Sequence, residues 1–166
     1  MWRKYAFQAL KYALILILVM FAVDWWRKPE APAAFARTEQ MLQNGGRFVA
    51  EEWSRDRVGV VYFWATWCGI CRYTSPDIVR LQQSGIPVVG VALQSGNDEE
   101  VAGYMRQQGL DFDNINDQNG VLSRDWQVAV TPTVVLLKNG KMVHHTTGIS
   151  SYWGLRARIA WADWRY

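Results

Sequence analysis

Two cysteines, Cys68 and Cys71, are the residues of this chain whose spacing points most directly to chemistry. They are its only cysteines, and the stretch 64–71 follows directly on the apolar run 58–63. Such a run predicts a buried strand, and the cysteine pair would then stand where a helix begins. Backbone N–H groups and the positive end of the dipole at a helix start stabilise a thiolate, and a second thiol nearby resolves a mixed disulfide. The spacing therefore predicts dithiol–disulfide exchange, in which Cys68 attacks and Cys71 resolves.

A metal site and a structural disulfide are the alternative interpretations of the pair. A zinc site needs further ligands, and the only histidines, His144 and His145, point to opposite faces if they lie on a strand. A structural disulfide across two residues would constrain the unfolded chain very little. Thiolates also suit Cu(I), so a copper-binding protein or chaperone that uses both cysteines and one histidine stays open as a second function. The favoured function needs neither a metal nor a cofactor.

The pair Thr131-Pro132 is a second landmark, because it immediately precedes an apolar run over residues 134–137. Proline cannot donate a hydrogen bond to a sheet, and the bond before a proline is the one that can be cis. Taken alone, the pair is also typical of the start of an edge strand. The cysteine pair upstream makes this edge-strand interpretation of Thr131-Pro132 the weaker one.

The stretch 64–71, Trp-Ala-Thr-Trp-Cys-Gly-Ile-Cys, closely resembles the active site of thioredoxin. The resemblance to thioredoxin-like proteins covers roughly residues 58–164 and implies an α/β fold, a central mixed sheet flanked by helices. It also implies that Pro132 is cis and packs against Cys68 and Cys71. The backbone of Thr131 would then be offered to an extended segment of the substrate.

The residues beside the cysteines are candidates for substrate contact. Trp67 adjoins the reactive thiol, so we expect an exposed platform for an apolar partner surface rather than a core residue. Gly69 and Ile70 lie between the thiols, where we expect them to contact the substrate and to tune the reduction potential of the pair.

The finer resemblance is to membrane-anchored thioredoxins. The distance from Cys71 to Pro132 is longer than in plain thioredoxin, and the additional helix and strand expected over residues 98–116 look like the insertion of TlpA/ResA-type periplasmic thioredoxins. Four features look closest to the suppressor for copper sensitivity D type: an amino-terminal anchor, Trp-Ala-Thr-Trp-Cys over 64–68, the stretch 91–96 and the tryptophan-rich end. The resemblance implies a disulfide reductase that acts on cysteines of extracytoplasmic proteins. It also implies that electrons arrive from an integral-membrane thiol transporter.

One position departs from the thioredoxin pattern. Thioredoxin has a buried aspartate six residues before its first cysteine, and this chain has Tyr62 there. A tyrosine, with a pKa of about 10, is a poor proton acceptor at neutral pH. Glu99 and Glu100 lie in the inserted element, where TlpA-like proteins can place an acid near the cysteines, but a first-turn role that complements the helix dipole is the favoured interpretation. The sequence therefore assigns no proton acceptor.

The amino terminus predicts a membrane anchor. An apolar run over residues 12–23 extends to 22 residues over 5–26. A helix of that length spans about 33 Å, against a hydrocarbon core of about 30 Å, and aromatic residues flank both ends. A signal peptide cleaved near Ala31-Pro32-Ala33 is the competing interpretation. A small excess of positive charge before the run points the amino terminus to the cytoplasm, so we expect a single-pass protein of a bacterial inner membrane with its catalytic domain in the periplasm.

The distribution of charge separates the amino terminus from the rest of the chain. The net charge is +3, of which residues 1–28 carry +4, so the rest of the chain carries about −1. No stripe of basic residues with interleaved aromatics follows, so nucleic acid is not an expected partner. We expect the anchor over residues 1–28, a linker over 29–36 and one thioredoxin-like domain over 37–166.

Helix and strand patterns alternate through this domain. A weak helix is expected over residues 37–42, and residues 48–55 fit either a strand or a helix. Asn139-Gly140 predicts a hairpin turn between the last two strands. The other expected elements are strands over 58–64, 88–93, 112–116, 133–137 and 142–147, and helices over 68–83, 98–109, 121–126 and 152–164.

Overall fold

The computed structural model describes residues 7–8, 10–12, 14–16, 18–19, 22 and 29–166. The described positions before residue 29 are helical and exposed, and the other positions of the expected anchor over 1–28 lie outside the described residues. Within the described part of the chain, no helix is both long enough and apolar enough to cross a membrane. The anchor and its orientation stay predictions.

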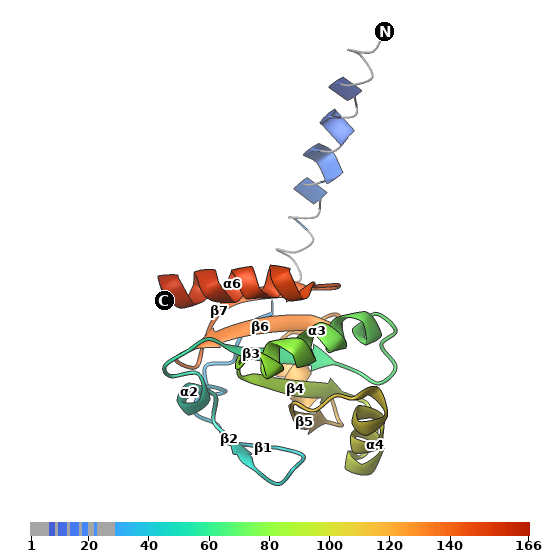
Figure 1. Cartoon of the computed structure of the whole chain (residues 1–166), viewed down its shortest axis with the longest axis vertical. Helices are drawn as coiled ribbons and strands as arrows, with labels where there is room; N and C mark the ends of the chain where they lie inside the picture. Colours follow the sequence, from blue (N-terminus) through green and yellow to red (C-terminus); the bar gives the residue numbers. More distant parts are fainter. Residues whose placement is uncertain (1–6, 9, 13, 17, 20–21, 23–28) are drawn as a thin grey trace.

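A five-stranded mixed sheet forms the centre of the domain. Its strands are β3 (Gly59–Trp64), β4 (Val88–Leu93), β5 (Asp113–Asp117), β6 (Thr133–Lys138) and β7 (Lys141–Thr147). They lie in the order β5-β4-β3-β6-β7 (Figure 1). β4 is parallel to β3 and β5, whereas β6 is antiparallel to β3 and β7. All six residues of the central strand β3 are buried, as its unbroken apolar sequence predicts.

Helices cover both faces of this sheet, which confirms the thioredoxin-like α/β architecture. On β3, Tyr62 and Trp64 face one core cluster while Val61 and Phe63 face the other, because side chains alternate along a strand. The first cluster is completed by α3 (Cys71–Gln83), α4 (Asp98–Gln108) and α6 (Tyr152–Arg165). The second cluster includes residues of α2 (Ala50–Trp53), of α5 (Val121–Asp125) and of the segment that precedes α2.

The expected helix over residues 37–42 is wrong. The chain instead forms β1 (Gln40–Met41), which pairs antiparallel with β2 (Arg47–Phe48). Gln43 explains the difference, because its N–H donates to the carbonyl of Asn114 and its side chain accepts a bond from the Asn114 amide. These tertiary hydrogen bonds outweigh a weak helix propensity. The undecided stretch 48–55 holds the end of β2 and the short helix α2.

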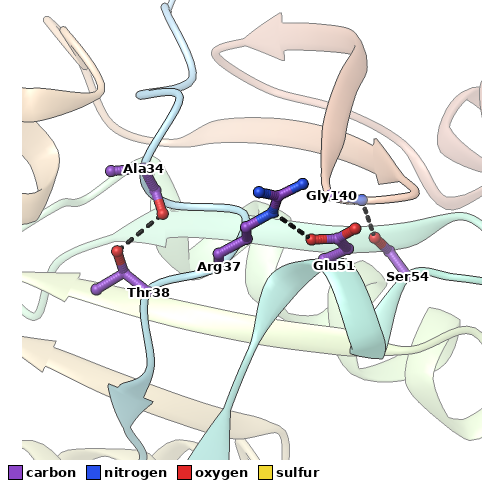
Figure 2. A network of polar contacts seen from close by, with 6 residues as sticks. All are labelled: Ala34, Arg37, Thr38, Glu51, Ser54 and Gly140. Carbon is purple, nitrogen blue, oxygen red and sulfur yellow. Dashed lines mark hydrogen bonds and ion pairs between the residues drawn. The ribbon is translucent and has the colours of Figure 1, made fainter.

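Residues 29–38 lie along the domain, on the face that carries α2. Phe35 is only 4% exposed and packs edge-on against Trp126, with ring centroids 4.8 Å apart. In Figure 2, Thr38 donates to the carbonyl of Ala34 and Arg37 pairs with a carboxylate oxygen of Glu51 at 3.1 Å. The boundary between linker and domain at residue 36 stays a prediction, but Phe35 already belongs to the core.

Candidate active site

Cys68 and Cys71 form a disulfide, with their Cα atoms 5.3 Å apart. The helix α3 begins at Cys71, three residues later than expected, because residues 65–70 form the connection from β3. The N–H of Cys71, in the first turn of α3, donates to the sulfur of Cys68 at 3.1 Å. A helix-start N–H aimed at this sulfur stabilises negative charge there once the disulfide is reduced.

Exposed side chains flank the disulfide, while the two sulfur-bearing residues are themselves buried. Trp67 is 61% exposed and Ile70 is 47% exposed, and an added side chain at Gly69 would meet only open space. Tyr73, in the first turn of α3, is 76% exposed and was not singled out from the sequence. The surface beside the disulfide is therefore apolar and open to a protein partner.

The loop after β4 holds the loop before the cysteines. Trp67 donates its indole N–H to the carbonyl of Gln94 at 3.1 Å. The N–H of Thr66 donates to the hydroxyl of Ser95 at 3.0 Å, and this hydroxyl in turn donates to the carbonyl of Leu93. Gln94 takes a positive φ of 43° there. The contact of Gln94 with Trp67 could not be predicted from the sequence, where the stretch 91–96 carries only a resemblance.

The bond between Thr131 and Pro132 is cis, which confirms that expectation. Thr133 pairs with Phe63, so Pro132 lies at the end of the sheet where β3 runs into the cysteine loop. Pro132 is buried and its carbonyl accepts a hydrogen bond from the N–H of Gly148, whereas Thr131 is half-buried. The position fits a substrate-contacting pair beside the disulfide, and the contacts expected for Thr131 and Pro132 stay predictions.

Tyr62 is fully buried, and its hydroxyl lies 3.0 Å from the hydroxyl of Ser75, one helical turn after Cys71. Burial raises the pKa of Tyr62 above its ordinary value, and the hydrogen bond with Ser75 opposes this only in part. The phenol is therefore neutral at physiological pH, and Tyr62 cannot serve as a proton acceptor there.

The acidic residues of the inserted helix have a structural role. Glu100 accepts from the N–H of Asn97, and the Asn97 side chain accepts from the N–H of Glu100, which together form a capping box at the start of α4. This confirms the first-turn interpretation for Glu100. Glu99 is exposed in the same turn, where an acidic residue complements the helix dipole.

The two histidines lie on β7 with ring centroids 6.2 Å apart. His144 is paired with Leu136 and His145 with Val135, and these partners belong to the clusters on opposite faces of the sheet. In the part of the chain that the structure describes, no three His, Cys, Asp or Glu side chains are grouped so that they could hold one metal ion.

Comparison with known proteins agrees with this geometry. The AhpC/TSA family model matches residues 30–146. A thioredoxin-like protein of Haemophilus influenzae is 39% identical over 161 residues, which cover 97% of this chain and 96% of that protein. The thiol:disulfide interchange protein DsbE of Pseudomonas aeruginosa is 25% identical over 143 residues, or 82% of this chain and 79% of that one.

Solved structures share the fold. A secreted disulfide oxidoreductase of Mycobacterium tuberculosis superimposes with a TM-score of 0.64 at 21% identity, over 77% of this chain and 98% of that one. The family match spans most of the chain, and the Haemophilus influenzae relative spans nearly all of it. The protein with the Cys68–Cys71 disulfide at the start of α3 therefore belongs to the AhpC/TSA family of thioredoxin-like proteins.

Proposed function

We propose that the protein is a membrane-tethered thiol–disulfide oxidoreductase that reduces disulfides of periplasmic proteins through Cys68-Gly69-Ile70-Cys71. The observation that carries the proposal is the Cys68–Cys71 disulfide at the start of α3, with the N–H of Cys71 directed at the sulfur of Cys68. The names of the relatives support it, since one is a thiol:disulfide interchange protein and another a disulfide oxidoreductase.

The reaction takes two exchanges. In the reduced protein, the thiolate of Cys68 attacks one sulfur of the substrate disulfide, and the other substrate sulfur leaves as a thiolate that takes up a proton. The thiol of Cys71 then loses its proton and attacks the sulfur of Cys68. This forms the Cys68–Cys71 disulfide and releases the second substrate sulfur as a thiol. The substrate gains two electrons and two protons, and the protein loses them.

The surroundings of the disulfide support a protein as the substrate. Trp67, Gly69 and Ile70 are exposed beside the disulfide, where they can contact the chain that carries the target cysteines. Thr131 and Pro132, at the same end of the sheet, position that chain. The oxidised protein regains two electrons from an integral-membrane thiol transporter, as in the suppressor for copper sensitivity D type that the sequence resembles.

Membrane tethering rests on the apolar amino terminus. Residues 1–28 act as a retained single-pass anchor of the inner membrane, and the catalytic domain lies in the periplasm. Contacts of Glu30 support retention: its N–H donates to the carbonyl of Trp126, and its carboxylate accepts from the side chain of Gln127. Cleavage near Ala31-Pro32-Ala33 would remove these contacts from the folded domain.

The equilibrium reduction potential of the cysteine pair tests the direction of exchange. Equilibration of the full chain with glutathione mixtures, followed by alkylation of free thiols and mass spectrometry, gives the fraction that is reduced. A value near that of thioredoxin, about −270 mV, is expected for a reductase. A value near that of DsbA, about −120 mV, would make the protein an oxidant and contradict the proposed direction.

A further inference from the structure

The outer side of α6 carries an apolar surface that thiol exchange does not use. Leu155, Ile159 and Ala162 are buried and attach the helix to the core. At 100° per residue, the opposite side of the helix holds an arc of about 100° that contains no charged residue. We call this arc the α6 stripe; its residues are Trp153, Ala157, Ala160, Trp161 and Trp164.

The α6 stripe is open to its surroundings. Its three tryptophans are 73%, 46% and 84% exposed, and both alanines are exposed as well. A tryptophan is among the largest apolar side chains, and three on one helix face form a patch that a protein normally covers. The described part of this chain does not cover it.

Positive charge borders the stripe on both sides. Around the helix, Arg158 and Arg165 lie next to one edge of the arc, and Arg156 lies next to the other edge. The guanidinium of Arg165 lies 5.2 Å from the ring centre of Trp161. The one acidic residue of α6, Asp163, is paired with Lys138 at the end of β6. The stripe therefore presents indole rings framed by three guanidinium groups to anything that approaches it.

An apolar helix face that is bordered by arginines is suited to binding a lipid surface. Tryptophan prefers the boundary between headgroups and hydrocarbon, because its ring is apolar while its N–H can be hydrated. A helix with an apolar stripe and arginines at its borders lies in that boundary, and arginine adds attraction for anionic headgroups.

The start of the domain lies close to the same helix. Pro29 lines a cavity together with Asn139 and Lys141 of the β6–β7 turn, and the neighbouring Lys138 pairs with Asp163 of α6. In Figure 1, α6 forms the edge of the domain on the side of the described amino-terminal helical residues. A chain that leaves a membrane before Pro29 would therefore bring α6 close to that membrane.

We propose that the α6 stripe rests on the surface of an anionic lipid bilayer, in addition to the amino-terminal anchor; the proposal rests on the anchor of the proposed function. α6 contacts β6 and β7, and in Figure 1 β5 is the strand of the sheet farthest from α6. In this arrangement β7 lies nearest to the lipid and β5 farthest from it. β3, which leads into the cysteine loop, lies two strands from β7, about 10 Å. In this orientation the β7 edge of the sheet faces the membrane, and the disulfide is held at a fixed height above the bilayer.

Quenching by brominated lipid tests the contact. The full chain is reconstituted into vesicles of phosphatidylcholine and phosphatidylglycerol, with either ordinary or brominated acyl chains. The emission of the three stripe tryptophans is obtained as the difference between the wild type and the W153F/W161F/W164F variant, so tryptophans of the amino terminus cancel. We expect this emission to fall about twofold in brominated lipid, because the rings lie at the acyl boundary.

Two matched controls sharpen the result. The difference between the wild type and W67F reports another exposed tryptophan, at the disulfide, and its emission should not respond to bromination. R156Q/R158Q/R165Q should reduce the quenching of the stripe tryptophans in these vesicles, whereas R47Q/R55Q/R106Q, with three exposed arginines elsewhere, should not.

The outcomes separate this proposal from the proposed function. If the chain stays with the vesicles and the stripe tryptophans are not quenched, the stripe does not contact lipid, and this proposal is contradicted while the anchor is retained. If the chain separates from the vesicles on flotation, both the anchor and the lipid contact of α6 are contradicted. The thiol chemistry is measured independently through the reduction potential.

Discussion

The two cysteines differ in what surrounds each sulfur. Cys68 is 6% exposed and Cys71 is 1% exposed, and the sulfur of Cys68 accepts the N–H of Cys71 at the start of α3. Hydrogen bonding and access both favour Cys68 as the thiolate that meets a partner, because a donated N–H stabilises a thiolate and deeper burial disfavours one. This asymmetry supports the proposed order of attack, in which Cys68 acts first.

The asymmetry predicts the outcome of single cysteine substitutions. Cys71→Ser should accumulate mixed disulfides between Cys68 and partner proteins, because no thiol remains to resolve them. Cys68→Ser should trap little, since Cys71 is shielded. Trapped species are counted on non-reducing gels, with C68S/C71S as the control. Equal trapping by the two single variants would overturn the assignment of nucleophile and resolver.

Tyr62 predicts a stability effect at high pH. Burial raises the pKa of Tyr62 in the folded state, so the unfolded chain loses this proton first as the pH rises. The stabilising contribution is fully present below the ordinary pKa of about 10, and it is lost progressively as the pH rises from there through the higher pKa of the folded state. Tyr62→Phe should remove that part of the decline in unfolding free energy between about pH 9 and pH 11.

The same variant separates two roles of the tyrosine. Loss of the hydrogen bond with Ser75 should cost about 1 kcal/mol at pH 7, measured by urea unfolding. The pH dependence of Cys68 alkylation should not change, because a neutral phenol accepts no proton. A shift in that alkylation profile would show that Tyr62 takes part in proton transfer.

The loop after β4 acts on the active site through Ser95. Ser95→Ala removes the acceptor of the Thr66 N–H, so the unfolding free energy should fall by about 1 kcal/mol. The loop that carries Trp67 is then held less firmly, and substrate reduction should slow as well. Ser84→Ala is the matched control, because its hydroxyl donates to the carbonyl of Leu81 at the end of α3, away from the cysteine loop. Its substrate reduction rate should equal that of the wild type.

Two glycines can be compared: Gly140 lies in the turn between β6 and β7, and Gly148 directly follows β7. Gly140 and Gly148 both have positive φ, but a Cβ at Gly140 would lie 3.0 Å from the Cα of Glu51, whereas a Cβ at Gly148 would meet nothing within 4 Å. Gly148→Ala should cost about 1 kcal/mol for the left-handed backbone alone. Gly140→Ala should cost a further 1–3 kcal/mol, roughly, from overpacking. Similar losses in urea unfolding would show that the turn moves freely away from α2.

Local signals explain which elements could be predicted. The apolar sequence of β3, the cap of α4 and the Asn139-Gly140 turn each act over a few residues, so their positions follow from the sequence. β1 replaces an expected helix because Gln43 bonds to Asn114, far along the chain. Likewise, the Cys68–Cys71 site and its cis proline followed from motifs. The support of Trp67 by Gln94 did not, because a backbone carbonyl that accepts a bond leaves no mark on residue type.

Seen as a whole, the domain has two unlike sides. The face with α2 and α5 is closed by the segment after Pro29, whose Phe35 fills the core, whereas α6 on the other face leaves its tryptophans uncovered. The segment that begins at Pro29 is thus part of the folded domain. An anchor before Pro29 would hold the whole domain, including its disulfide, within a short distance of the membrane.

The anchor predicts how the intact protein fractionates. The 22-residue apolar stretch over 5–26 is expected to span a bilayer, so the full chain should stay in the membrane fraction through carbonate washing. A variant with Leu14, Leu16 and Leu18 replaced by Arg should be released, because charges at the centre of a span are costly. Replacement of the exposed Arg47, Arg55 and Arg106 by Leu is the matched control and should leave the protein in the membrane.

Recovery of a soluble wild-type form that begins near Ala34 would identify the amino-terminal segment as a cleaved signal peptide. That form would also lack the bond from Glu30 to Trp126, so its domain should unfold at a lower urea concentration than the full chain.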